Sequence, residues 1–190
     1  MSDRPEPGAR TAPPVYPSWW LRPARPSDAR ALSVLIAGIH AEGRWFVGDE
    51  GPTADAVRRR LQGAEPAYEA TFVAEGSVAP GLLGWIELHR YRPWRLAHVA
   101  SLTVAVAAPA RGHGIGRRLL ETGIGWAERN AVRKLRLDVR AGNVAARRLY
   151  ASAGFTVEAV ERGQVALGDG RFEDNVAMAR WLDGEGPGGG

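Results

Sequence analysis

The stretch ARGHGIGRRLLETG, Ala110 to Gly123, constrains the fold of this chain most. It places glycines at positions 112, 114 and 116 directly before a helix-patterned segment, and the strand-like run 98–106 comes just ahead of it. A strand, a glycine-rich turn and a helix in this order leave the first helical N–H groups without intrahelical partners, at the positive end of the helix dipole. The stretch therefore predicts an α/β fold with an anion site, such as a phosphate site, at the start of this helix.

The spacing of the glycines excludes the two common phosphate loops. A dinucleotide fingerprint needs two residues between its last glycines, whereas Gly114 and Gly116 are separated by one. A Walker A loop needs a lysine followed by serine or threonine, and this stretch has no lysine. Glycines here would let backbone N–H groups approach a ligand directly. A tight turn in which they only relieve backbone strain explains the same residues.

The length and composition predict one globular domain with irregular ends. The chain has 190 residues, 45% of them hydrophobic, enough for one sizeable core. Residues 1–18 are rich in proline and lack the apolar core of a signal peptide, so we expect a flexible arm, and residues 183–190 read as a flexible glycine-rich tail. The domain would span 19–182. Its longest apolar run, 102–110, is about half the length of a membrane-spanning helix, which predicts a soluble, cytoplasmic protein.

Several kinds of chemistry are excluded by residue usage. Without cysteine the chain has no disulfide, no cysteine-bearing zinc site and no thiol nucleophile, and its four histidines show no metal-ligand spacing, so we expect no metal. The net charge of +4 and the sequence pI of about 10.1 raise the question of nucleic acid. Because the arginines are scattered among acidic residues, we expect no nucleic-acid partner.

Hydrophobic periodicity predicts a mixed, mostly antiparallel sheet of six to seven strands with helices on both faces. The first strands form an antiparallel meander, and the strand, helix and strand around the glycine-rich turn form a parallel crossover. Helices are expected after Pro26, after Thr53, after the glycines and from Asn143 to the cap at Gly154. Strands are expected at 21–25, 69–76, 81–91, 98–106, 134–140, 155–160 and 173–181.

Arg111, Gly114 and Gly116 resemble the acetyl-CoA signature of the GCN5-related N-acetyltransferase (GNAT) superfamily, in which Arg or Gln, two residues, Gly, one residue, then Gly or Ala open a helix. A second segment of this family, NVAARRLYASAGF, follows at 143–155, and the element order matches from about Leu21 to Leu182. The resemblance implies the GNAT fold, in which two parallel strands splay apart. It also implies acetyl-CoA as co-substrate, filling the gap between them.

The resemblance also implies which residues contact the cofactor. N–H groups of 112–117 would hold the CoA pyrophosphate, and the strand edge at 104–106 would pair with the pantetheine arm. Asn143 would contact the arm from the other side, although a plain helix N-cap explains this residue equally well. The implied set is Val104, Val106, Arg111, Gly112, His113, Gly114, Ile115, Gly116, Arg117, Asn143, Arg147 and Tyr150.

Acetyl transfer to an amine needs a proton donor for the departing thiolate and a base for the amine. Tyr150 matches the acid of the family, and the alternative is a tyrosine buried in the core. For the base we place Glu87 first, with His98 and Glu42 as alternatives. Any of the three could instead be solvated or paired.

The acceptor pocket of this superfamily is built between its first two helices, where this chain has Trp45 and Phe46. These rings could line such a pocket or belong to the core. The leading hypothesis is N-acetylation of a small primary amine: an amino acid, a polyamine or an amine antibiotic. Alternatives are acetylation of a protein N-terminus or lysine, and a non-catalytic acyl-CoA sensor. We expect no membrane partner, and exposed sheet edges make a homodimer plausible.

Overall fold

The computed structural model describes residues 18–48, 50–77, 81–184 and 186, which form one seven-stranded sheet covered by helices. The strand order is β1-β2-β3-β4-β5-β7-β6, and only β4 and β5 run parallel within this sheet. The bounds are β1 Trp19–Pro23, β2 Glu69–Gly76, β3 Leu82–Arg90, β4 Val99–Val106, β5 Lys134–Arg140, β6 Thr156–Ala166 and β7 Phe172–Trp181. The mixed α/β sheet with a parallel pair confirms the predicted fold class.

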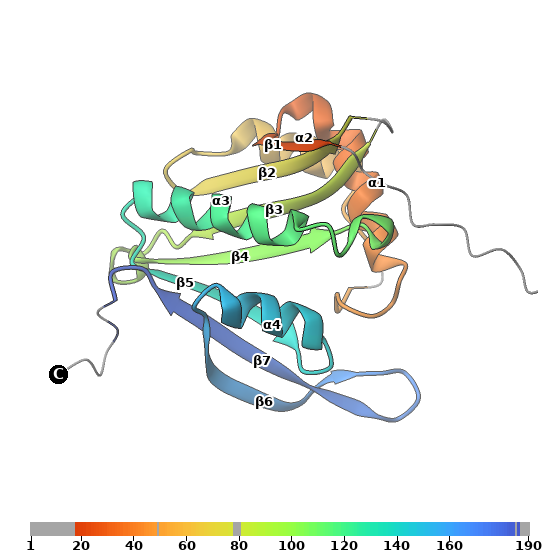
Figure 1. Ribbon diagram of the computed structural model, residues 1–190, viewed down its shortest axis with the longest axis vertical. Helices are drawn as coiled ribbons and strands as arrows, with labels where there is room; N and C mark the ends of the chain where they lie inside the picture. The colour runs from red at the N-terminus through yellow and green to blue at the C-terminus, as the bar shows by residue number, and fades with distance from the viewer. Residues whose placement is uncertain (1–17, 49, 78–80, 185, 187–190) are drawn as a thin grey trace, which may run out of the picture.

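Four α-helices of the described chain cover the two faces of the sheet (Figure 1). They are α1 Ala29–His40, α2 Ala54–Gly63, α3 Ile115–Arg129 and α4 Val144–Ser152. On one face α1 and α2 pack against Val73 and Trp85, and on the other α3 packs against Ile86 and Leu88. Strand alternation explains the two cores, because successive residues of β2 and β3 point to opposite faces.

The parallel pair is hydrogen-bonded only at its start. Pairing between β4 and β5 runs from Val99↔Lys134 to Ser101↔Arg136, although β4 continues to Val106 and β5 to Arg140. The two strands therefore separate toward their carboxyl ends (Figure 1). Beyond Ser101 the edge of β4 has no strand partner on this side, which agrees with the splayed pair that the sequence resemblance implied.

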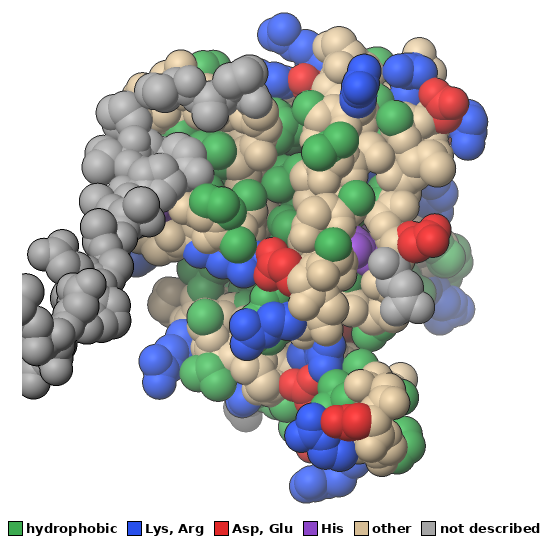
Figure 2. All heavy atoms as spheres, turned by 90° about the vertical axis from the view of Figure 1, so that its right-hand side faces the viewer, with side chains coloured by type: hydrophobic (Ala, Val, Ile, Leu, Met, Phe, Trp, Pro, Cys, Tyr) green, Lys and Arg blue, Asp and Glu red, His purple; other side chains and the backbone are tan. Residues whose placement is uncertain are grey.

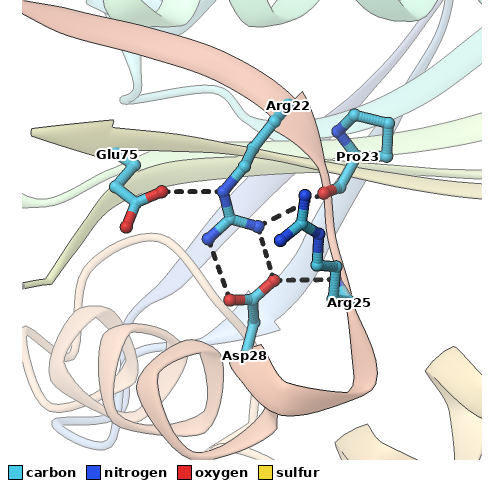
Figure 3. Close-up of polar contacts among 5 residues, drawn as sticks. All are labelled: Arg22, Pro23, Arg25, Asp28 and Glu75. Atoms are coloured by element: carbon cyan, nitrogen blue, oxygen red, sulfur yellow. Dashed lines mark hydrogen bonds and ion pairs between the residues drawn. The ribbon is translucent and has the colours of Figure 1, made fainter.

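A charged cluster ties the first strand to the first helix and to β2 (Figure 3). Arg22 of β1 donates to both oxygens of Asp28, at 2.7 and 2.9 Å, and its Nε donates to Glu75 at 2.7 Å. Asp28 also accepts from the backbone N–H of Arg25 at 2.7 Å. The bonds from Arg22 hold the pKa of the Asp28 carboxyl below its usual value. The cluster thus fixes the edge of the sheet where the chain enters it.

Most predicted elements are present, with two informative differences: β1 lies at Trp19–Pro23 rather than at the predicted 21–25, and β6 is longer than predicted. Strands β2 and β5 have the predicted bounds, and Thr53 and Asn143 cap their helices by accepting from Ala56 N and Ala146 N. β6 runs to Ala166, past the predicted end at 160, because nearly all of its side chains are exposed and leave no alternation to detect. Of the predicted arm, 1–18, only Ser18 is described, and of the predicted tail, 183–190, only Asp183, Gly184 and Gly186 are described.

Candidate active site

A cleft of about 930 Å³ opens where β4 and β5 separate. The loop between α1 and α2, the glycine-rich loop and the β6–β7 hairpin lie at the same end of the molecule (Figure 1). Figure 2 looks onto this end and shows acidic and basic side chains interspersed over it. A cleft of this size is at the upper end of small-molecule sites. Of the predicted site residues, those in its lining are Val104, Val106, Arg111, Gly112, Gly114, Ile115, Gly116, Arg117, Asn143 and Tyr150.

The glycine-rich loop presents unpaired backbone donors to this cleft. Gly112 and Gly114 have φ values of +83° and +79°, a conformation that side chains other than glycine adopt with strain. The loop turns there, and α3 begins at Ile115. Within the described residues, no hydrogen bond is made by the backbone N–H groups of Gly112, Gly114, Ile115, Gly116 and Arg117. Such donors at a helix N-terminus form a site for an anion.

α4 forms the opposite wall of the cleft. A Cβ on Gly116 would lie 3.4 Å from Leu149 Cδ2, so a small residue lets α3 and α4 approach here. Asn143, at the start of α4, caps the helix through Oδ1, which accepts from Ala146 N at 3.1 Å. Because Asn143 also lines the cleft, the cap and a ligand contact are compatible roles.

Tyr150 lies on α4 with its side chain in the lining of the cleft and 7% of its surface exposed. Its ring packs against Phe155 at 6.1 Å between centroids. Burial raises the pKa of the Tyr150 hydroxyl to about 12. The phenol is therefore protonated at neutral pH, as a proton donor must be.

An aromatic wall comes from the loop after α1. Trp45, Phe46 and Val47 line the cleft, so both predicted aromatic residues border it. Phe46 is also stacked between His40, at 4.6 Å between centroids, and Trp85 of the core, at 6.0 Å. Phe46 therefore both lines the cleft and packs on the core, so the two alternatives for these rings hold together at this residue.

None of the three predicted base candidates is a free carboxylate or imidazole in the cleft. Glu87 lies outside the lining and is paired with Arg60 at 2.8 Å and His89 at 2.9 Å, and the hydrogen bond to Glu87 raises the pKa of His89. His98 stacks on Trp181, at 6.1 Å between centroids, at the other end of β4. Glu42 forms an ion pair with the motif arginine, Arg111.

Two of the implied cofactor contacts also lie outside the lining. The ring of His113 turns back to its own loop, where Nδ1 lies 3.0 Å from Arg111 O. Arg147 donates through Nη1 to Ala141 O at 3.2 Å and borders a second, smaller cavity on the outer side of α4. The sequence motif placed both near the cofactor, but the direction of each side chain depends on contacts that the motif does not contain.

The structure adds polar residues that the sequence did not single out. Asp138 of β5, which accepts two bonds from Arg136 at 2.9 and 3.0 Å, and Glu161 of β6, which accepts from Asn175 at 2.8 Å, both line the cleft. Alternation along 134–140 places Asp138 on one face with Arg136. The alternation in the sequence does not indicate that this face of β5 borders the cleft.

The acetyltransferase (GNAT) family model matches residues 39–155, more than half of the chain, including the loop after α1, the glycine-rich loop and Tyr150. The chain belongs to the GNAT family. Its members use acetyl-CoA as acyl donor. The motif resemblance read from Arg111, Gly114 and Gly116 is thereby confirmed.

Two curated relatives and one solved structure illustrate the range of this similarity. The [ribosomal protein bS18]-alanine N-acetyltransferase of Escherichia coli (strain K12) is 42% identical over 76 residues, 40% of this chain and 51% of that enzyme, so the match spans about half of its length. The phosphinothricin N-acetyltransferase of Alcaligenes faecalis is 32% identical over 166 residues, 86% of this chain and 82% of that enzyme.

The solved structure shares the fold. A GNAT superfamily phosphinothricin acetyltransferase from Sinorhizobium meliloti, in complex with acetyl-CoA, aligns with a TM-score of 0.77 and 19% identity over 86% of this chain and 88% of that one. The two curated relatives are named for different acceptors, an alanine of ribosomal protein bS18 and phosphinothricin, so the family alone leaves the acceptor open. In the described part of the chain, no helix is long and apolar enough to cross a membrane.

Proposed function

We propose that this protein is an acetyl-CoA-dependent N-acetyltransferase whose acceptor is a small primary amine: an amino acid, a polyamine or an amine antibiotic. One observation carries the proposal. Backbone donors without acceptors, at the N-terminus of α3, face a cleft between two strands that have separated. A diphosphate fits such donors, because its oxygens accept charge-assisted bonds of about 1.5–3 kcal/mol each.

The residues of the cleft fit acetyl-CoA in shape as well as in charge. No atom lies within 4 Å of where a Cβ would stand on Gly112 or Gly114, so the backbone there is open to a ligand. The edge of β4 at 104–106 pairs with no strand of the described residues on this side, although Val106 O accepts from Arg111 Nε, and it offers backbone groups to an extended amide chain, as a neighbouring strand would. When bound, acetyl-CoA supplies an acyl group activated as a thioester.

In acetyl transfer the protein would supply a hydrogen-bond donor to the oxyanion and a proton to the departing thiolate. The attacking amine must lose a proton, and the developing oxyanion requires an N–H donor, which would come from the edge of β4 near Val104. Tyr150 would donate a proton to the thiolate, whose conjugate acid has a pKa near 8.5. Burial keeps the phenol protonated, but a pKa of about 12 makes it a weaker acid than the thiol, so this proton transfer runs uphill.

The aromatic wall supports a small acceptor over a folded protein surface. Trp45, Phe46 and Val47 line the same cleft as polar side chains of β5, so an amine with a compact apolar portion would find both kinds of contact there. The similarity to the bS18-alanine enzyme gives one specific alternative, the alanine N-terminus of a protein.

The test is release of thiol from acetyl-CoA by purified protein, against amino acids, polyamines, aminoglycosides, phosphinothricin and short alanine-terminated peptides. We expect release with one class of small amine. Tyr150→Phe should lower kcat by about tenfold or more, since losing a general acid costs about a hundred- to ten-thousand-fold in many enzymes, while CoA binding is retained.

Two results would count against the proposal. Release with the peptides alone would assign the protein to N-terminal acetylation. Binding of CoA without release on any acceptor would make it a non-catalytic acyl-CoA sensor.

A further inference from the structure

One side chain connects the two loops that border the cleft from different parts of the sequence. Arg111, in the glycine-rich loop, places Nη2 2.6 Å from Glu42 Oε1, in the loop after α1, 69 residues away along the chain. Its Nε donates to Val106 O, at the end of β4, at 3.0 Å. The guanidinium thus bridges the end of β4 and Glu42, and leaves the anion to the backbone N–H groups of the loop.

Glu42 stands where the aromatic wall begins. Its N–H donates to Ile39 O at 3.2 Å as α1 ends, and Gly43 follows with a φ of +62°. Trp45 and Phe46 come next and line the cleft. Fixing Glu42 therefore fixes the start of the short segment, 43–47, that carries the wall.

The ion pair is partly exposed to solvent. Glu42 is mostly covered, with 20% of its side chain exposed, and Arg111 is more open, at 39%. Within the described residues Glu42 has no other ionic partner. The far end of the segment has its own anchor, because Phe46 is stacked on His40 and His40 Nδ1 lies 2.8 Å from Gly48 O.

We propose that Glu42 is a positioning residue: through Arg111 it couples occupancy of the acetyl-CoA site to the arrangement of the acceptor wall, 43–47. The inference rests on the proposed function, because it takes CoA as the ligand of the glycine-rich loop. An anion bound to the N–H groups of this loop holds the loop in one conformation and therefore holds Arg111. Arg111 then holds Glu42, and the wall is formed before the acceptor arrives. Coupling of this kind is reciprocal.

The experiment is limited trypsin digestion with and without saturating CoA, a readout independent of catalysis. Arg44 is exposed and lies inside the coupled segment, so cleavage after it reports on the order of that segment. Mass spectrometry would follow the rate at which the peptide beginning at Trp45 is formed. We expect CoA to slow this cleavage by about fivefold or more in the wild type, the lower end of typical coupling, and by less than about twofold in Glu42→Gln.

Two further variants keep the outcome interpretable. Glu42→Asp retains the carboxylate on a shorter chain and should recover part of the protection. Glu50→Gln removes an exposed carboxylate from the same loop, one for which no ion pair is found among the described residues, and should behave as the wild type. Thermal unfolding and the CoA dissociation constant, measured for each variant, show that a change in cleavage does not reflect a lost fold or lost binding.

The failures are distinguishable. If CoA binds and Arg44 is cleaved equally fast with and without it, or if Glu42→Gln is protected as well as the wild type, the coupling is refuted and the proposed function stands. Faster cleavage with CoA would mean that the anion takes Arg111 away from Glu42, which also overturns the proposal. If CoA does not bind at all, the proposed function fails first, and this inference fails with it.

Discussion

At the scale of single residues, the carboxylates near the cleft differ in whether they can reach the attacking amine as a base. Glu87 is neutralised by Arg60 and lies outside the lining, whereas Asp138 borders the cleft on the strand that separates from β4. We propose Asp138, which borders the cleft although Arg136 pairs with it, as the base that accepts the proton of the amine. Asp138→Asn should then lower kcat/KM about tenfold or more and flatten its rise with pH. Glu87→Gln should leave the position of the pH profile unchanged.

The measurement is the pH dependence of kcat/KM for both variants, with Glu161→Gln as a second carboxylate of the lining. A profile that changes only in Glu87→Gln would restore the base predicted from the sequence, acting through water. A profile that changes in none of them would assign proton removal to solvent.

Residues whose role depends on the backbone were the ones that the sequence could predict. Gly112 and Gly114 follow from the motif because their positive φ is a property of the loop itself. Asn143 was open between cap and ligand contact, and the structure makes both compatible. The directions of Glu87 and Arg147 could not be predicted, because each is set by partners distant in sequence or by the packing of α4.

At the scale of elements, the start of α3 is the feature on which cofactor binding depends. Gly114 has a φ of +79°, so alanine there would cost about 1–2 kcal/mol or turn the adjacent N–H groups away from the cleft. We expect Gly114→Ala to weaken CoA binding at least tenfold by isothermal titration calorimetry. Gly38→Ala, in the middle of α1 with open space around it, is the control and should bind CoA as the wild type does.

If Gly114→Ala binds CoA with unchanged affinity, the glycines serve the turn alone, which was the alternative explanation of the motif. The sequence predicted closely those elements whose bounds depend on nearby residues. The helices after Thr53 and Asn143 begin at cap residues, and β5 shows an alternating pattern. The length of β6 was not, since its pairing with β7 is interrupted by two irregularities and its side chains are exposed. The part of the cleft lining that comes from β6, including Glu161, could therefore not be predicted from the sequence.

For the whole molecule, the cluster around Arg22 links stability to pH. The pKa of Asp28 is lower in the folded state than its ordinary value of 3.8, so its contribution is present above that value and is lost as pH falls through the lower, folded pKa. Falling pH also adds positive charge to a chain that already carries +4. Acid should therefore loosen the β1 edge of the sheet, at the opposite end of the strand order from β6.

Asp28→Asn tests this link at the scale of global unfolding. Because the aspartate accepts two bonds from Arg22 and one from the backbone of Arg25, its loss should lower the free energy of unfolding in urea by about 1.5–3 kcal/mol at pH 7. The difference from the wild type should begin to shrink below about pH 4, where the carboxylate of the unfolded chain binds a proton, and should be lost as pH falls through the lower, folded pKa. Asp55→Asn, at an exposed ion pair with Arg58, should cost less than about 1 kcal/mol at any pH. A difference for Asp28→Asn that stays constant from pH 7 to pH 3 would mean that its charge does not stabilise the fold.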